Sequence, residues 1–553
     1  MEHKKFWAVT GRALAAMAVM LTITLTAATS QAQTFTKLVD FQGANGQWPT
    51  DELVQGRDGA FYGTTMLGGA YGGGTVFKVT PGGTLTSLYS SPNDEPDGGL
   101  FLATDGNLYG TTLNGGEYFD GTIFNITPSG SLTTLYTFCS KPNCADGASP
   151  NGLLQASDGK FYGTTEYGGS RDWGTVFKIT PSGALTTLYN FCSKRSCDDS
   201  GGPLAGLVQA SDGNFYGTTV DNFWVRGGTI FQVTPSGRLT TLYTFCSQPS
   251  CADGKSPQAK LIQAADGNLY GTTYQGGISD CGTIFTMAPN GSLKTLHLFD
   301  GTDGCTPIGS LLQATDGNLY GTTCCDGANH RGTIFIVSTN GVLTTLYSFQ
   351  DTDGSPGGGL FQSTGGALYG TTVDGGAYDC GGYHCGTIYR LDMGFGPFVR
   401  LVRDLGKVGQ TGGILGQGFT GTIDVSLNGT PASFTIVSNT FMKATVPAGV
   451  TTGYVTVITP SGTLTSNVPF RVTPQLLSFD PPSGPVGTQV TITGVSLTQT
   501  QAIGFGDRVP AQFTVNSDTQ VTATVPAGAK TGKVGIETKG GIAISSGTFT
   551  VIP

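Results

Sequence analysis

Short runs of apolar and β-branched residues alternate with turns rich in glycine, proline and aspartate along most of the chain. The stretch 152–191 is representative and contains, in order, the runs 152–156, 161–165, 174–180 and 185–191. An Asp-Gly turn, a glycine-rich loop and a Pro-Ser-Gly turn separate these runs. Because glycine accepts positive φ and proline presets φ, both kinds of turn are typical of β-hairpins. The pattern predicts a unit of four antiparallel strands.

This unit recurs. The tetrapeptide Tyr-Gly-Thr-Thr begins at seven positions spaced by 47 to 54 residues: Tyr62, Tyr109, Tyr162, Tyr216, Tyr270, Tyr320 and Tyr369. A Gly-Thr pair begins 12 residues after each of the first six tyrosines and 17 residues after the seventh, at Gly386. Four-stranded units of about 50 residues are the blades of a β-propeller.

The two ends of the repeat region complement each other. The seventh unit stops after its third strand, at Tyr389–Asp392, and the missing fourth strand matches Phe35–Phe41 at the other end. A blade completed in this way leaves no open sheet edge. The sequence therefore predicts an all-β fold, with a seven-bladed β-propeller over residues 33–394 that is closed by the N-terminal strand.

A second repeat follows the propeller. Ala444–Gly449 returns as Ala523–Gly528, within short alternating strands separated by frequent turns. This pattern predicts two immunoglobulin-like β-sandwich domains, over residues 395–473 and 474–553.

The propeller units resemble the GloVer tandem repeat of bacterial choice-of-anchor proteins, most clearly at Asp105–Thr112, Gly121–Phe124 and Thr127–Tyr136. The resemblance covers about residues 34–393. It implies a surface or secreted protein of unknown activity, although we expect no C-terminal anchor here. The C-terminal domains resemble the IPT/TIG family, best at Pro482–Gly494. That resemblance implies spacers or accessory binding modules.

The first 32 residues are typical of a signal peptide. Basic residues precede the apolar run 13–28, and Ser30-Gln31-Ala32 has the small-x-small form of a cleavage site. The apolar run is shorter than the roughly 20 residues of a spanning helix. We expect a monomeric extracellular or cell-surface protein, with no stable membrane span after cleavage.

All 12 cysteines lie between Cys139 and Cys385. Eight form four C-x4-C pairs: Cys139/Cys144, Cys192/Cys197, Cys246/Cys251 and Cys380/Cys385. Close cysteine pairs also bind zinc, but pairs spread over separate repeats of an exported chain favour disulfides. The remaining residues, Cys281, Cys305, Cys324 and Cys325, allow three pairings, and the sequence does not separate them.

The charge balance excludes one class of partner. With 28 basic and 37 acidic residues, the formal net charge is −9. The signal region holds three of the basic residues and one acidic residue, so the exported chain is more acidic still. Nucleic-acid binding relies on Lys and Arg neutralising phosphates, and we expect no such partner.

A ligand should meet the face that carries the loops between second and third strands and the connections between blades, since the opposite face holds only tight turns. Aromatic and acidic residues gather in these loops, and the candidates for ligand binding are Trp48, Trp173, Trp224, Phe223, Tyr118, Tyr378 and Asp172. Aromatic faces beside carboxylates suit a sugar. The alternative is that the aromatics pack against adjacent blades to order the loops.

The sequence gives less support for a catalytic or metal site. His330 and His384 lie in loops of adjacent blades without a third ligand, and two Asp-Gly segments, 300–304 and 351–354, lack a full calcium loop. Carboxylates are plentiful: Asp94, Glu95, Asp97, Glu117, Asp172 and Asp199. Our leading hypothesis is a non-catalytic protein that binds extracellular glycan or a cell-surface component. We assign it no catalytic residue, metal or cofactor. The alternatives are a lyase or glycosidase acting on extracellular polysaccharide and a structural envelope protein.

Overall fold

The computed structural model describes residues 33–553 except 194–196, 221–226, 383 and 507–508. The predicted signal peptide, together with Phe223 and Trp224, lies outside the described residues. Regular structure in the described residues consists of 48 strands and two short 3-10 helices, η1 (Pro142–Cys144) and η2 (Pro249–Cys251). No described helix has the length and apolar character needed to cross a membrane.

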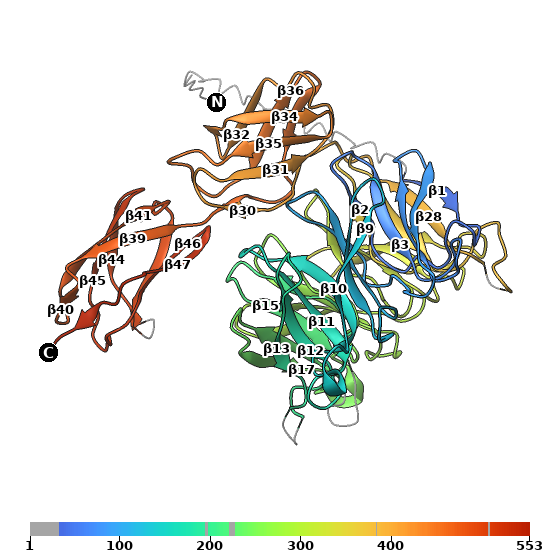
Figure 1. Ribbon diagram of the computed structural model, residues 1–553, viewed down its shortest axis with the longest axis horizontal. Coiled ribbons are helices and arrows are strands. Elements are labelled where there is room, and N and C mark those ends of the chain that lie inside the picture. The colour runs from blue at the N-terminus through green and yellow to red at the C-terminus, as the bar shows by residue number, and fades with distance from the viewer. Residues whose placement is uncertain (1–32, 194–196, 221–226, 383, 507–508) are drawn as a thin grey trace, which may run out of the picture. The chain divides into compact units, whose positions relative to one another are not determined.

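Seven four-stranded antiparallel sheets form from the described residues 34–392, and each is one blade (Figure 1). The first strands are β2 (Val54–Gln55), β6 (Leu100–Leu102), β10 (Ala148–Gln155), β14 (Val208–Gln209), β18 (Ile262–Gln263), β22 (Leu312–Gln313) and β26 (Phe361–Gln362). The second strands begin one residue before the repeated tyrosines: β3 (Phe61–Thr65), β7 (Leu108–Thr112), β11 (Phe161–Tyr167), β15 (Phe215–Thr219), β19 (Leu269–Thr273), β23 (Leu319–Thr323) and β27 (Leu368–Thr372).

The third strands begin at the threonine of each Gly-Thr pair: β4 (Thr75–Val79), β8 (Thr122–Ile126), β12 (Thr175–Ile179), β16 (Thr229–Val233), β20 (Thr283–Met287), β24 (Thr333–Val337) and β28 (Thr387–Asp392). The fourth strands are half exposed: β5 (Leu85–Ser90), β9 (Leu132–Thr137), β13 (Leu185–Asn190), β17 (Leu239–Thr244), β21 (Leu293–Leu298), β25 (Leu343–Ser348) and, for the seventh blade, β1 (Thr34–Asp40). Strand β1 pairs antiparallel with β28, as predicted.

The repeated threonines meet across the second and third strands. In the first blade the hydroxyls of Thr65 and Thr75 lie 2.9 Å apart, and the backbone N–H of Thr75 donates to the Thr65 hydroxyl. The same pair of threonines occurs in the other six blades. These buried hydroxyls therefore satisfy one another, which explains why both halves of the motif recur.

Neighbouring blades share buried apolar clusters around the whole ring. At the junction of the first and seventh blades, Phe61 packs against Tyr369 with ring centroids 4.5 Å apart. Phe361 and Ile388 lie in the same cluster. The first and seventh blades are therefore joined by side-chain packing, while β1 completes the seventh sheet.

The first C-terminal domain contains the sheets β29-β31-β35-β34 and β33-β32-β36-β37 and the parallel pair β30-β38. Its strands are β29 (Arg400–Leu401), β30 (Leu405–Gly406), β31 (Thr411–Leu415), β32 (Asp424–Leu427), β33 (Thr430–Pro431), β34 (Phe434–Ser438), β35 (Phe441–Thr445), β36 (Val455–Thr459), β37 (Gly462–Thr465) and β38 (Arg471–Val472). Its core includes Phe419, Met442 and Val457.

The second C-terminal domain repeats this strand order, with sheets β39-β41-β45-β44 and β43-β42-β46-β47 and the parallel pair β40-β48. Its strands are β39 (Gln475–Asp480), β40 (Ser483–Gly484), β41 (Gln489–Val495), β42 (Thr500–Phe505), β43 (Val509–Pro510), β44 (Phe513–Ser517), β45 (Gln520–Thr524), β46 (Val534–Thr538), β47 (Gly541–Ile544) and β48 (Thr550–Val551). Its core includes Ile492, Phe505 and Val534. The boundaries predicted at 394/395 and 473/474 fall between strands.

Candidate functional site

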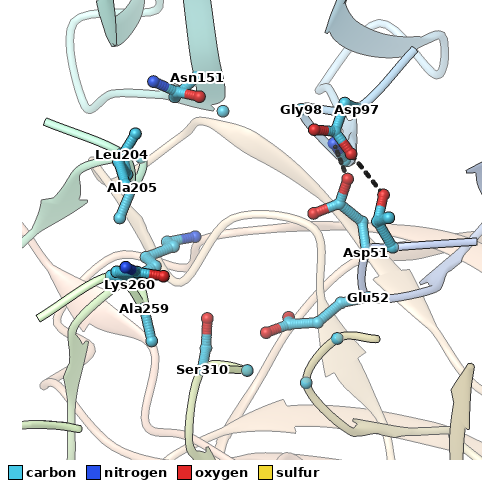
Figure 2. A pocket seen from close by; sticks show the side chains of 18 of the residues that line it. Asp51, Glu52, Asp97, Gly98, Asn151, Leu204, Ala205, Ala259, Lys260 and Ser310 are labelled. Carbon is cyan, nitrogen blue, oxygen red and sulfur yellow. Dashed lines mark hydrogen bonds between the residues drawn. The ribbon is translucent and has the colours of Figure 1, made fainter. Parts of the chain in front are cut away.

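A cavity of about 210 Å³ lies where the seven blades converge (Figure 2). All seven blades line it, through residues that precede their first strands or lie in them. Glycines allow this convergence: a Cβ added to Gly309 would lie 2.5 Å from the backbone nitrogen of Gly359 in the next blade. In each antiparallel blade the first strand begins at the same end as the loop between second and third strands. The cavity therefore belongs to the face on which we expected a ligand.

Two carboxylates from adjacent blades are held reciprocally at the cavity. The Thr50 hydroxyl of the first blade donates a 2.5 Å hydrogen bond to Asp97 of the second blade. In return, the Gly99 backbone N–H of the second blade donates a 2.8 Å hydrogen bond to Asp51 of the first. Figure 2 shows the Asp51 and Asp97 side chains side by side.

The surroundings of Asp51 and Asp97 disfavour the ionised form of both carboxyl groups. Burial raises the pKa of Asp51 well above its usual value, and the neighbouring charge of Asp97 raises it further, against the Gly99 hydrogen bond. Burial also raises the pKa of Asp97, an effect that the Thr50 hydrogen bond opposes. Two carboxyl groups so placed can share a proton or accept hydrogen bonds from a ligand.

Further polar side chains, both charged and neutral, line the rest of the cavity. Glu52 follows Asp51, and burial raises the pKa of Glu52, against the charge of Lys260 and a hydrogen bond with Ser310. Lys260 comes from the fifth blade, and its side chain is exposed, so the cavity opens to solvent. Asn151 adds an amide from the third blade. The site thus offers hydrogen-bond donors and acceptors from several directions around one small space (Figure 2).

Of the loop residues predicted to bind ligand, the five that the structure describes, Trp48, Tyr118, Asp172, Trp173 and Tyr378, do not line this cavity. Trp48 and Trp173 are half-buried, and Trp173 packs against the shared core of the third and fourth blades. That contact supports the packing alternative for Trp173. Tyr118 and Tyr378 are each 44% exposed. Asp172 is exposed, and its carboxylate accepts a 2.8 Å hydrogen bond from the Gly168 backbone N–H of its own loop.

Sequence reasoning named Asp97 among many carboxylates but missed Asp51, Glu52 and Lys260. A signal was available, because the residues before each first strand differ from blade to blade while the strands themselves repeat. Repeated positions serve packing that every blade needs. Residues that differ between blades do not serve this shared packing, and where they converge at the centre of the ring they can form a site.

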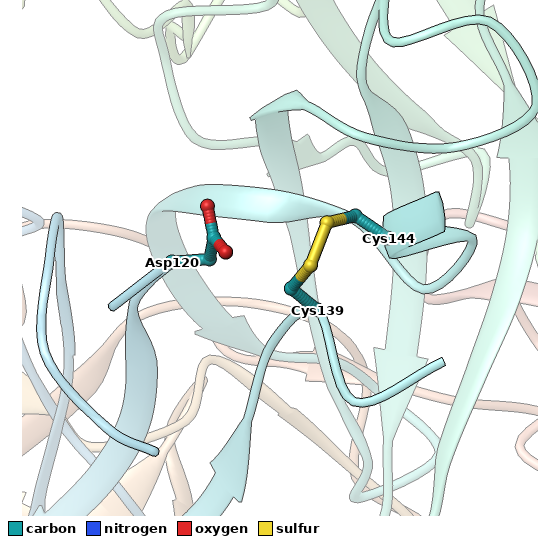
Figure 3. A group of neighbouring side chains, drawn as sticks. All are labelled: Asp120, Cys139 and Cys144. Carbon is teal, nitrogen blue, oxygen red and sulfur yellow. A yellow bond between two sulfur atoms is a disulfide. The ribbon is translucent and has the colours of Figure 1, made fainter. Parts of the chain in front are cut away.

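The four C-x4-C pairs are disulfide-bonded, as expected. Of the three pairings left open by the sequence, the structure joins Cys281 to Cys305 and leaves Cys324 and Cys325 as thiols. Asp120 lies beside the Cys139–Cys144 disulfide (Figure 3). Oxidised sulfurs cannot act as the thiolate ligands that zinc requires, so this group does not form a zinc site.

Several other titratable residues in the propeller have structural partners. His297 takes the place of a repeated tyrosine and pairs with Asp303 at 2.5 Å, as Tyr347 of the next blade pairs with Asp353 at 2.7 Å. These aspartates belong to the two segments considered for calcium. His330 is highly exposed and lies 3.9 Å from Asp326 in its own loop.

Residues 23–154 and 149–389 match the model of the Gloeobacter/Verrucomicrobia repeat. The chain belongs to the Gloeobacter/Verrucomicrobia repeat family. Residues 474–551 match the IPT/TIG domain. The repeat match agrees with the resemblance found in the sequence, and the IPT/TIG match agrees with it for the second C-terminal domain. No curated protein matches this repeat protein.

The solved structures that match this Gloeobacter/Verrucomicrobia repeat protein share little sequence with it. A streptogramin B lyase is 16% identical with a TM-score of 0.46, over 65% of this chain and 97% of the lyase. An inactive virginiamycin B lyase variant from Staphylococcus aureus, with quinupristin, is 17% identical with a TM-score of 0.46, over 65% and 99% of the two chains. A surface glycan-binding protein from Prevotella bryantii is 18% identical with a TM-score of 0.22, over 28% and 41%. These similarities assign no activity.

Proposed function

We propose that the protein is an exported, non-catalytic binding protein whose propeller recognises an extracellular glycan at the cavity where the seven blades converge. The observation that carries this proposal is the convergence of Asp51, Asp97, Asn151 and Lys260 on one solvent-open space lined by all seven blades. Five disulfides fit an exported chain.

The chemistry of the cavity suits a sugar residue. Sugar hydroxyls can donate to the carboxyl groups of Asp51 and Asp97 and accept from the ammonium group of Lys260. A cavity of about 210 Å³ is small, so it would hold one terminal residue and leave the rest of a chain on the surrounding face. Exposed aromatic side chains on that face, such as Phe119 (67% exposed) and Tyr378, offer flat surfaces to the remaining sugars.

Calorimetric titration of the full exported chain with oligosaccharides of different charge and linkage tests this proposal. We expect saturable binding by at least one oligosaccharide, with affinity reduced at least tenfold by Asp51→Asn and by Lys260→Met. Matched controls are Glu537→Gln in the second C-terminal domain and Lys294→Met on a fourth strand, since both side chains are exposed and neither lines the cavity.

The outcomes separate the cavity from the loops. Binding that survives both cavity substitutions but is lost in Tyr118→Ala or Tyr378→Ala would move the ligand to the loop aromatics. Absence of binding by the folded protein across the panel would contradict glycan recognition and favour the structural envelope role.

A second candidate function is cleavage of extracellular polysaccharide. It is favoured by the raised pKa of Asp51, because a carboxyl group that keeps its proton nearer to neutral pH can act as a general acid. Asp97 would then serve as its partner carboxylate. Release of reducing or unsaturated ends, abolished in Asp51→Asn, would support the enzyme. Retention of an intact polymer would support the binding protein.

A further inference from the structure

Two adjacent cysteines at the end of β23 stand apart from the other ten. Cys139, Cys144, Cys192, Cys197, Cys246, Cys251, Cys281, Cys305, Cys380 and Cys385 are all joined in disulfides. Cys324 and Cys325 are the two that carry thiols, and Cys325 is exposed. An exposed free dithiol is unusual in an exported chain, because the compartments it passes through and reaches are oxidising.

The geometry brings these two sulfurs together. Their Sγ atoms lie 2.6 Å apart. Non-bonded heavy atoms rest at about 3.5–4.0 Å, whereas a disulfide bond is about 2.0 Å long. The observed separation is therefore well inside a non-bonded contact and is closer to the length of a disulfide bond than to that of a non-bonded contact.

The backbone around the pair is held in place. Cys305 and Cys325 exchange backbone hydrogen bonds of 2.8 and 3.3 Å, and the Cys324 N–H donates to the carbonyl of Thr306 at 3.2 Å. Cys305 is itself tied to Cys281 by a disulfide. These contacts keep the segment from separating the two thiols.

The pKa and the exposure of Cys325 also favour oxidation of the pair. The hydrogen bond with Cys324 lowers the pKa of Cys325 to about 7, so a substantial fraction of Cys325 is thiolate near neutral pH. The thiolate is the nucleophile of thiol–disulfide exchange. Its exposure gives an oxidant access.

We propose that Cys324 and Cys325 form a vicinal disulfide in the exported protein, a sixth bridge that acts as a reducible site on the exposed loop face of the sixth blade. The Cys325 thiolate attacks a disulfide donor of the exporting compartment, and a mixed disulfide forms as one donor sulfur leaves. Cys324, losing its proton, then attacks the Cys325 sulfur and releases the second donor sulfur. One S–S bond forms in the protein, and the donor leaves as a dithiol with two electrons and two protons.

This bridge is expected to be the most easily reduced of the six. Cys325 is exposed, whereas the ten cysteines of the other bridges are buried or half-buried, and an exposed disulfide is more readily reached and reduced than a buried one. Mild reductant should therefore open Cys324–Cys325 first, and it should expose a dithiol without disturbing the five other bridges.

Peptide mapping of the full exported chain tests the proposal. The purified protein is alkylated without reduction and digested with a protease that cleaves before aspartate. Cleavage before Asp280, Asp300, Asp303, Asp316 and Asp326 places Cys281 in 280–299, Cys305 in 303–315 and the adjacent cysteines in 316–325. We expect 316–325 as a separate peptide, unalkylated and lighter than its reduced form by two hydrogens, with 280–299 joined to 303–315.

Each other result overturns the proposal. Peptide 316–325 carrying two alkyl groups would show a stable dithiol, and peptide 316–325 joined to 280–299 and 303–315 would show a different pairing. Cys325→Ser is the control for detection, since it should leave one alkylated cysteine in this peptide. In the double variant Cys281→Ser/Cys305→Ser, 316–325 should remain oxidised. In a reductant titration of the wild type, this peptide should become alkylated at lower reductant concentration than any other.

Discussion

The hydroxyl of Thr50 in the first blade donates a 2.5 Å hydrogen bond to the carboxylate of Asp97 in the second. The reverse bond, from the Gly99 backbone to Asp51, makes the contact reciprocal. This exchange fixes both carboxyl groups at the cavity where the seven blades converge, and there each is partly buried and the charge of Asp97 acts on Asp51. A hydrogen-bonded but poorly solvated acid pair is costly to ionise.

Replacing Asp51 by asparagine should therefore stabilise the protein at neutral pH. Because the pKa of Asp51 is raised in the folded state, its favourable contribution is present below the usual aspartate pKa and is lost as pH rises above about 4. The asparagine side chain would keep an acceptor for the Gly99 N–H without carrying a charge. We expect a higher unfolding free energy than that of the wild type at pH 7 and little difference near pH 3. Thermal unfolding across this range checks it, with Glu537→Gln as the exposed control, and a variant less stable than wild type at pH 7 would contradict it.

Tyr216 should contribute to stability through its hydroxyl. It donates a 2.9 Å hydrogen bond to Asp212 of the preceding turn and accepts one of 2.7 Å from Gln232. The Tyr216→Phe variant should lose about 1–2 kcal/mol of unfolding free energy, measured by denaturant titration. Tyr369→Phe is the matched control, because the turn before Tyr369 holds Gly365 and Gly366 in place of Asp-Gly. Equal losses of unfolding free energy in the two variants would show that the hydrogen bond to Asp212 does not account for the loss in Tyr216→Phe.

The protein should lose stability at alkaline pH. Burial, assisted by Asp212, raises the pKa of Tyr216 from 10.0 to about 12. A raised pKa in the folded state gives stability that is complete below about pH 10 and declines as pH rises through 12. The unfolding midpoint should fall across this interval, and the fall should be shallower in Tyr216→Phe. An unchanged slope in that variant would assign the decline to other groups.

The disulfides should differ in their contribution according to loop length. Cys139–Cys144 closes a separation of five residues, whereas Cys281–Cys305 closes one of 24. The loss of chain entropy in the unfolded state predicts about 2 kcal/mol for the short bridge and about 3.5 kcal/mol for the long one. Paired Cys→Ser variants compared by denaturant titration check this order, and a greater loss from the short bridge would oppose the entropic account.

Several aspartates have two roles where the sequence indicated one. Asp158 forms the Asp-Gly turn of the third blade, and its carboxylate also accepts a 3.0 Å hydrogen bond from Tyr162, four residues later. The spacing was visible in the sequence, because most of the repeated tyrosines follow an Asp-Gly turn. Whether the hydroxyl points toward the turn depends on the strand's twist and packing, which the spacing alone does not set.

Local patterns that recur along the chain were enough to predict the four-stranded blade, the closing strand and the short disulfides. Turn residues, the alternation of apolar runs with turns, and the spacing of motifs are properties of neighbouring residues. Because they recur in every repeat, they can be recognised in the sequence. The pairing of Cys281 with Cys305 and the set of residues that share the axis became evident only in the folded ring. Asp51, Asn151 and Lys260 lie far apart in the chain and belong to no common pattern. They meet because seven blades converge at one place, and that convergence is a property of the whole ring.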